Sequence, residues 1–190
     1  MKEELTTEGV GITTEQTFKS TDQDFRTQLN AVKQNNPDAI VVSALSQPAI
    51  LIMKQARELG ITQPFIRGNG FSSTVVLRDA GTAAEGLIVG AAWNIATDTP
   101  MNKLFVNSFR TKYHEDPDQF AARAYTGVYL IAEAIKRSGT TTDRTKLREA
   151  LAGIKDYPTP LGAFSFSSNG DAEEQPVVHI VKDRKFVLLS

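Results

Sequence analysis

The spacing of apolar residues changes partway along DAIVVSALSQPAILIMKQARELG, which begins at Asp38. The stretch Asp38–Ser43 is a short apolar run without alternation, which is typical of a parallel strand covered on both faces. Beyond it, apolar residues recur at helical spacing. They are Ile50, Ile52, Met53, Ala56 and Leu59. Because Pro48 suits the first turn of a helix, Ser46 or Gln47 is predicted as its N-cap.

The alternation of strand and helix patterns extends on both sides of this segment. Further strands are predicted at Val10–Phe18, Pro64–Arg67 and Gly86–Ala91. The helices between them follow the N-cap candidates Ser20, Thr21 and Asp22, and Ser72 and Ser73. The first of these helices carries Phe25, Leu29 and Val32 on one face. This order predicts an α/β fold, with a parallel sheet and helical crossovers over residues 9–91.

The pattern changes after a linker-like stretch at Asn94–Pro100. Three amphipathic helices are predicted at residues 101–115, 119–138 and 143–153. They are followed by a strand at Gly162–Phe166, a turn at SSNGD, a strand at Val177–Val181 and a short last strand at Phe186–Leu189. We therefore divide the chain into an α/β lobe at 1–93, a helical segment at 94–160 and C-terminal strands at 161–190.

Composition and charge narrow the possible partners. The 190 residues include 21 Lys and Arg against 22 Asp and Glu, a formal net charge of −1 without blocks of like charge. Neither nucleic acid nor an anionic membrane is expected as a partner. With no cysteine, disulfides and thiolate chemistry are excluded. The start, MKEELTTEGV, has no apolar signal-peptide core and reads as the tail of a helix whose beginning is absent.

Small polar residues follow two neighbouring strands of the predicted sheet. Ser43, Ser46 and Gln47 come after one strand, and Asn69 stands after the next in RGNGFSS. Ligands of open parallel sheets bind beyond the carboxyl ends of the strands, so these side chains could grip a small polar ligand. The alternative, helix capping and turn formation, fits the same residues. Spacing does not decide between the two.

No pattern for catalysis or cofactor binding stands out. His114 and His179 have no partners at metal-ligand spacing, so surface or packing roles are expected and no metal or cofactor is predicted. Gly68-Asn69-Gly70 lacks the third glycine of a dinucleotide site. No serine is set in a nucleophile-elbow pattern. The chain is therefore not expected to be an enzyme.

Several stretches together resemble the type I periplasmic solute-binding proteins of ABC transporters, in the branch that binds leucine, isoleucine and valine. They are TFKSTDQDFRTQLNAVKQNNPDAIVV, MKQARELGITQPFI, AAEGLIVG, AYTGVYLIAEAIKRSG and GAFSFSSNGDAEEQPVVHIVKDRKFV. The resemblance implies two α/β lobes that close on a ligand without chemistry, a membrane permease as partner and a periplasmic location. It also implies that residues 9–91 form most of the second lobe and that the first lobe's sheet is missing.

The resemblance also bears on individual residues. The candidate ligand contacts are Ser43, Ser46, Gln47, Asn69 and Phe71, and the resemblance implies a ligand role for Ser46 and Asn69. Ser46 matches a position where branched-chain amino acid binders have an aromatic hydroxyl, and Asn69 matches one that often holds a carboxylate for the ligand's ammonium group. An amide offers an acceptor oxygen but no charge, so the ligand need not be leucine. A ligand-sensing domain of the same fold and a fragment that binds nothing remain alternatives.

Without a first lobe, apolar helix faces would lack the sheet that they normally cover. These faces are carried by Phe105, Phe109, Phe120, Val128 and Ile131. Exposed apolar patches of this kind favour association. We therefore expect a dimer, or another chain that completes the fold.

Overall fold

The computed structural model describes residues 2–173 and 175–189, and they form two compact units. Of these residues, the first unit contains those up to Phe71, together with Val75–Val89 and Ile180–Val187. The second unit contains Ser72–Thr74, Gly90–His179 and the described residues from Leu188. Each unit has its own core and is described by itself.

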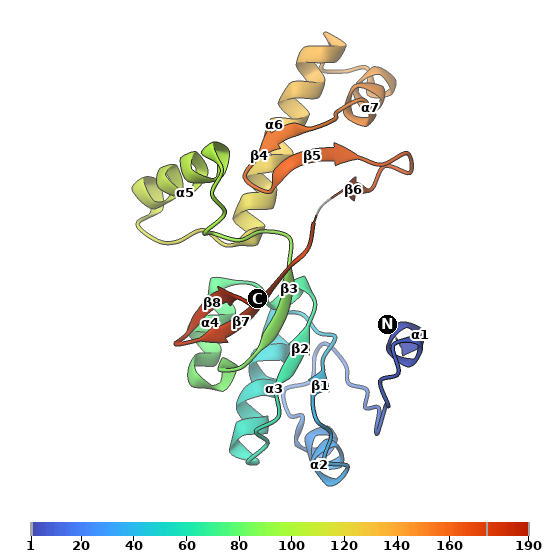
Figure 1. Cartoon of the computed structure of the whole chain (residues 1–190), viewed down its shortest axis with the longest axis vertical. Coiled ribbons are helices and arrows are strands. Elements are labelled where there is room, and N and C mark those ends of the chain that lie inside the picture. The colour runs from blue at the N-terminus through green and yellow to red at the C-terminus, as the bar shows by residue number, and fades with distance from the viewer. Residues whose placement is uncertain (1, 174, 190) are drawn as a thin grey trace. The chain divides into compact units, whose positions relative to one another are not determined.

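The first unit is built on a five-stranded sheet with the order β1-β2-β3-β7-β8 (Figure 1). Its strands are β1 (Ile40–Val41), β2 (Phe65–Arg67), β3 (Ile88–Ala91), β7 (Val177–Lys182) and β8 (Lys185–Leu188). The first three are parallel, with Ile40 opposite Phe65 and Ile66 opposite Ile88. The predicted parallel α/β sheet is confirmed, and β1 is shorter than the apolar run suggested.

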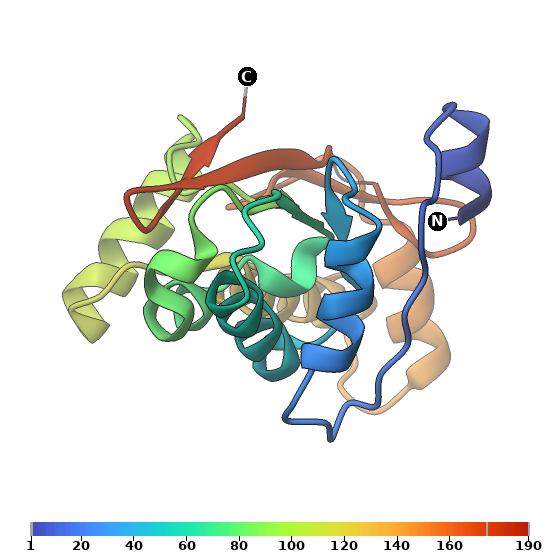
Figure 2. The ribbon, with the colours of Figure 1, turned by 90° about the horizontal axis from the view of Figure 1, so that it is seen from below.

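Three helices of the first unit, α2 (Arg26–Gln34), α3 (Ser46–Glu58) and α4 (Thr74–Ala80), gather on one face of this sheet. The unit also contains α1 (Lys2–Thr7) and the 3₁₀ turns η1 (Asn69–Phe71) and η2 (Gly81–Ala84). Figure 2 shows α2, α3 and α4 on the same side of the strands. Beneath them lies a core that includes Leu29, Met53, Phe65, Phe71 and Val89.

The prediction that Asp38–Ser43 is covered on both faces is wrong. Ile40 is buried, whereas Val41 is 42% exposed, and the neighbouring Ile66 of β2 is 36% exposed. The reason is that α2, α3 and α4 pack on the opposite face. Apolar side chains on this second face of a parallel sheet are thus open to solvent, where such sheets normally have a second layer.

The predicted strand at Val10–Phe18 is also absent, because residues 10–19 have no regular structure. A strand needs a neighbour to satisfy its N–H and C=O groups. In the described sheet, β1 is an edge strand whose neighbour is β2. Phe18 reaches the core instead and meets the ring of Phe25 edge-on at 5.3 Å.

The start of α2 differs from the prediction as well. The helix begins at Arg26, with Phe25 in the N-cap position and no side-chain cap. The backbone N–H of Phe25 is satisfied by the buried side chain of Gln55, whose Oε1 accepts it at 2.7 Å. Asp22, one of the predicted caps, accepts from the N–H of Lys19 instead. A contact distant in sequence thus satisfies the N–H of Phe25, while Oδ1 of Asp24 accepts from the N–H of Arg26 at 3.0 Å.

The second unit combines three helices with a small antiparallel sheet. The helices are α5 (Pro100–Tyr113), α6 (Gln119–Ser138) and α7 (Arg144–Ala152), and the strands are β4 (Tyr157–Thr159), β5 (Gly162–Phe166) and β6 (Ala172–Glu173). Thr99, Asp118 and Asp143 cap the helices through backbone N–H groups two to three residues on. The three predicted helices are confirmed.

The strand at 162–166 does not pair with the strand at 177–181, although these were the two strands predicted on either side of SSNGD. β5 lies between β4 and β6, whereas β7 lies between β3 and β8. β4, which the sequence analysis missed, pairs with β5 across a tight turn, with Thr159 opposite Gly162. Gly162, with a φ of 109°, permits this turn. On its other edge β5 pairs across SSNGD with β6, with Phe166 opposite Ala172.

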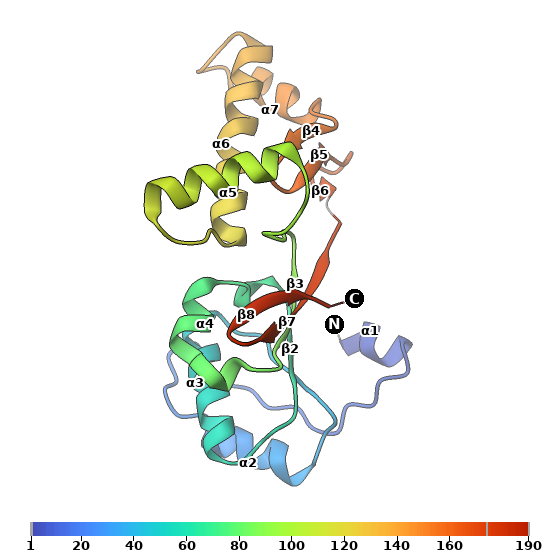
Figure 3. The same cartoon turned by 60° about the vertical axis from the view of Figure 1, so that its left-hand side comes forward.

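α6 has one buried and one exposed face. Ala122 packs with Trp93 and Phe105 of α5, and Leu130 packs with Ile154 and Phe164. Figure 3 shows α5 crossing in front of α6. Phe105 is buried, so the expectation that it faces an absent sheet is wrong. Its ring lies 5.9 Å from that of Trp93 and 5.0 Å from that of Tyr125, measured between ring centroids.

Candidate functional site

The tips of β1 and β2 lie side by side at one edge of the sheet. The strands are adjacent and parallel, so the chain leaves both at the same edge. After β1 the chain enters α3 at Ser46, and after β2 it enters η1 at Asn69. The Oγ of Ser46 donates to the backbone carbonyl of Gly70 at 3.4 Å. The structure thus brings together the two loops that the sequence singled out.

The candidate residues differ in exposure. Ser43, Gln47 and Asn69 are exposed, and Ser46 is half-buried. The side chain of Phe71 is buried in the core instead, so its ring cannot contact a ligand directly. Four of the five candidates therefore have side chains open to a ligand at this edge.

Ser72 and Ser73, the last residues of RGNGFSS, are buried and belong to the second unit. The Oγ of Ser73 donates to Oδ2 of Asp118 at 3.1 Å. Oδ1 of the same carboxylate accepts from the N–H of Ala121 in the first turn of α6. Ser73 thus supports the residue that caps α6. This contact gives Ser73 a structural role at a helix other than the one that it was predicted to cap.

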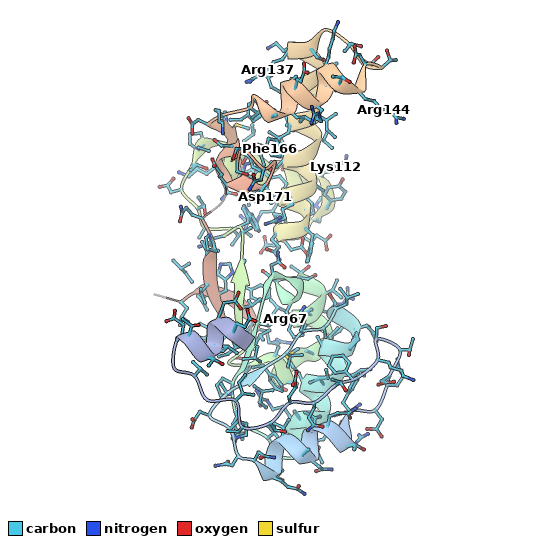
Figure 4. The ribbon with its side chains drawn as sticks, turned by 90° about the vertical axis from the view of Figure 1, so that its right-hand side faces the viewer. Arg67, Lys112, Arg137, Arg144, Phe166 and Asp171 are labelled. Atoms are coloured by element: carbon cyan, nitrogen blue, oxygen red, sulfur yellow. The ribbon has the colours of Figure 1, made fainter. Side chains whose placement is uncertain are left out.

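Sequence reasoning missed Arg67, the last residue of β2, which is labelled in Figure 4. Its Nη1 donates to the carbonyl of Val42 at 2.9 Å, and its Nη2 donates to the carbonyl of Ala44. Its guanidinium carbon lies 4.2 Å from the ring centroid of Phe71. The side chain therefore ties the β1–α3 loop to η1. A single cation at the end of an apolar strand, in PFIRGNG, was the available signal.

Gly70 allows the close approach of this side chain. A Cβ at position 70 would lie 2.6 Å from Nη2 of Arg67, well inside van der Waals contact. The guanidinium would have to move if any other residue stood there. The glycine in RGNGF therefore makes room for Arg67 as well as for a turn.

The electrostatic character of the edge is positive. The segments VSALSQ, from Val42, and RGNGFSS, from Arg67, contain no acidic residue. Among the described residues, none forms an ion pair with Arg67. Partial burial lowers the pKa of the Arg67 guanidinium. An arginine nevertheless stays protonated in proteins, so the charge persists at neutral pH.

Neither histidine belongs to this edge. His114 is exposed after α5, in a left-handed conformation with a φ of 57°. It lines an open hollow of about 500 Å³ with Arg110, Glu115 and Asp116, where Arg110 and Asp116 form an ion pair. Such a charged, open hollow is unlike the apolar clefts that hold small molecules. His179 is buried in β7, and burial lowers its pKa.

Within 2–173 and 175–189, no group of three or more His, Cys, Asp and Glu side chains is placed to hold a metal ion. In the same part of the chain, no helix is both long enough and apolar enough to cross a bilayer.

A parallel sheet with polar loops at its strand tips defines a class of α/β ligand-binding proteins, and comparisons with known proteins narrow the class. The family model described as "periplasmic binding protein" matches residues 1–182. The chain therefore belongs to the periplasmic binding protein family. This finding confirms the resemblance and the fold inferred from the sequence.

Individual relatives agree with this assignment. A leucine-, isoleucine-, valine-, threonine- and alanine-binding protein of Pseudomonas aeruginosa is 25% identical over 163 residues, which are 86% of this chain and 43% of that protein. The structure of a leucine-binding protein, LivK, from Thermotoga maritima is 32% identical with a TM-score of 0.85, covering 91% of this chain and 49% of that one.

A third relative was solved with its ligand. LivJ of Streptococcus pneumoniae, in complex with isoleucine, is 29% identical with a TM-score of 0.82, over 89% of this chain and 48% of that one. The chain thus spans about half the length of the relatives that it matches.

Proposed function

We propose that this chain binds a small polar solute at the tips of β1 and β2, without chemistry, for import by an ABC transporter. The hydrogen bond from Ser46 to Gly70 carries the proposal, because it joins two loops whose side chains can hydrogen-bond a ligand. Ser43, Ser46, Gln47 and Asn69 would contact the solute directly. Phe71 would contribute indirectly, because its ring packs against the guanidinium of Arg67 and helps to hold it in place.

The family supports the remaining parts of this proposal. Members are periplasmic binding proteins, so we place the working protein outside the cytoplasm, with a membrane permease as its partner. Capture would come from closure of two lobes around the solute, a motion in which the ligand selects the closed state. The relatives' names record amino acids as ligands, which makes amino acids the first solutes to test.

Binding should appear as stabilisation of the chain by its solute. A ligand at 100 times its dissociation constant raises the free energy of unfolding by about 2.7 kcal/mol. We expect one or more members of a panel of amino acids and small carboxylates to do so in thermal unfolding. Ser46→Ala should weaken that binding about fivefold to tenfold, because one hydrogen bond is worth about 1 kcal/mol.

Ser20→Ala is the matched control, since Ser20 is exposed in the irregular segment before α2. It should leave both the unfolding temperature and the ligand effect unchanged. A panel in which no solute stabilises the chain would contradict the proposal and favour a fragment that binds nothing.

We also propose that the exposed face of α6 is covered in the working protein, by a second copy or by another chain that completes the fold. Phe120, Val128 and Ile131 are 46%, 65% and 55% exposed. At about 100° per residue, they fall within about 80° of the helix circumference. The open face of the first unit's sheet, at Val41 and Ile66, is a second uncovered apolar surface. Surfaces of this kind favour association.

Val128→Lys with Ile131→Lys tests the α6 face. We expect the unchanged chain to associate with rising concentration in sedimentation velocity. The double substitution should weaken association at least about 100-fold, because an unpaired charge buried in an interface costs several kcal/mol. Val10→Lys with Ile12→Lys alters two exposed apolar residues elsewhere and should leave association intact. An unchanged chain that stays monomeric throughout would overturn self-association through this face.

A further inference from the structure

The positive charge of Arg67 at the tips of β1 and β2 restricts the kind of solute that can bind there. The two loops contain one cation, Arg67, and no carboxylate. A ligand ammonium group placed here would meet a like charge and no charged acceptor. A ligand carboxylate would meet an opposite charge and the side-chain amide of the exposed Gln47.

Arg67 is held in place but is not saturated by the protein. Its two hydrogen bonds go to the carbonyls of Val42 and Ala44, which use two of the five N–H groups of a guanidinium. Both acceptors are neutral, and the Phe71 ring that packs against the guanidinium carries no formal charge. The positive charge is therefore left without a counter-ion among the described residues.

A purely structural role for Arg67 explains the two carbonyl bonds but not the choice of a cation. A neutral side chain could donate to the carbonyls without bringing charge to a partly desolvated position, where the charged form is disfavoured. A bound anion would offset that cost, because charge-assisted hydrogen bonds are about twice as strong as neutral ones. The structure thus favours an anionic group as the occupant of this position.

We propose that Arg67 selects solutes that present a carboxylate to the tips of β1 and β2 and carry no ammonium group there, that is, small organic acids rather than free amino acids. The inference rests on the proposed function, since it names the class of solute for the same site. Arg67 would act as a specificity-determining residue, with the exposed Gln47 as a neutral donor beside it.

Three ligands of one carbon skeleton separate the alternatives. Leucine carries both charged groups, 4-methylpentanoate lacks the ammonium group, and 3-methylbutylamine lacks the carboxylate. Each is titrated into the ¹⁵N-labelled 190-residue chain at pH 7. Binding is followed through the backbone amides of Ser46, Gly68 and Gly70 and through the Nε–H of Arg67. We expect 4-methylpentanoate to bind at least about tenfold more tightly than leucine, and the amine not to bind.

Two substitutions test the role of the charge. Arg67→Gln should reduce the preference for 4-methylpentanoate over leucine to about onefold to twofold, since a neutral donor no longer distinguishes the two. Because that change also loosens the loops, Asn69→Asp serves as a second variant. It keeps Arg67 and adds a carboxylate at an exposed position, and it should shift the preference toward leucine.

Each outcome separates this inference from the proposed function. If leucine or the amine shifts the strand-tip resonances as strongly as 4-methylpentanoate does, the inference is overturned while solute binding at this edge stands. A preference for the acid that survives Arg67→Gln and Asn69→Asp unchanged also overturns it. If none of the three ligands, and no member of the wider panel, shifts these resonances, the proposed function fails and the inference fails with it.

Discussion

Phe65→Ala is expected to lower the free energy of unfolding of the first unit by about 3–5 kcal/mol. Phe65 is fully buried in β2, between β1 and β3, at the centre of the helix-covered face of the sheet. The guanidinium carbon of Arg57 lies 5.2 Å from its ring centroid, so the substitution removes this contact as well as the core packing. A loss of this size is a large fraction of the 5–15 kcal/mol that stabilises most domains.

The measurement is urea unfolding followed by far-UV circular dichroism, with amide exchange at β1 and β3 to locate the effect. Ile66→Ala is the matched control, because Ile66 is the next residue of the same strand and points to the exposed face. It should cost less than about 1 kcal/mol, as surface substitutions usually do. Equal losses for the two variants would show that the sheet is covered on both faces.

Asn102→Ala should destabilise the second unit by about 2–4 kcal/mol, because several buried groups lose their partner at once. The Oδ1 of this buried asparagine accepts from Nε1 of Trp93 at 2.7 Å. Its Nδ2 donates to the carbonyls of Ile95 and Thr97 at 3.1 and 2.9 Å. One side chain thus holds the loop that leads into α5.

Trp93 is the one tryptophan of the sequence, so its fluorescence reports this unit directly during urea unfolding. Asn107→Ala supplies the control, since Asn107 is exposed on the same helix. It should shift the midpoint very little. A midpoint for Asn102→Ala that matches the control would mean that water replaces the lost hydrogen bonds without cost.

The regular elements of the fold were largely predictable from local patterns. Helices such as α3 and α6 have apolar residues at helical spacing, and α6 is bounded by Asp118 and Gly139, so its ends were found as well. The errors fell where structure depends on distant partners. The segment Val10–Phe18 has a strand pattern but no neighbour to pair with. The strand that pairs with β5 across SSNGD is the short β6, whereas β7 joins the other sheet between β3 and β8.

The candidate site was predictable only in part, for a similar reason. Strand tips follow from topology, so the loops containing Ser46 and Asn69 could be located. The part played by Arg67 depends on carbonyls of Val42 and Ala44, which lie more than twenty residues away in the sequence. The burial of Phe71 could not be predicted either. A single aromatic residue in a turn belongs to no helical or strand repeat that would indicate which way its side chain points.

The fixing of Arg67 by two carbonyls and an aromatic ring has a consequence for the thermodynamics of capture. A free arginine side chain loses up to about 2 kcal/mol of rotamer entropy when it is ordered. Here the side chain is already ordered before any solute binds, so this loss of rotamer entropy does not reduce the free energy of binding. Calorimetry should therefore show little entropic penalty from this side chain, and solutes of the wrong charge are met by a rigid group that does not adapt to them.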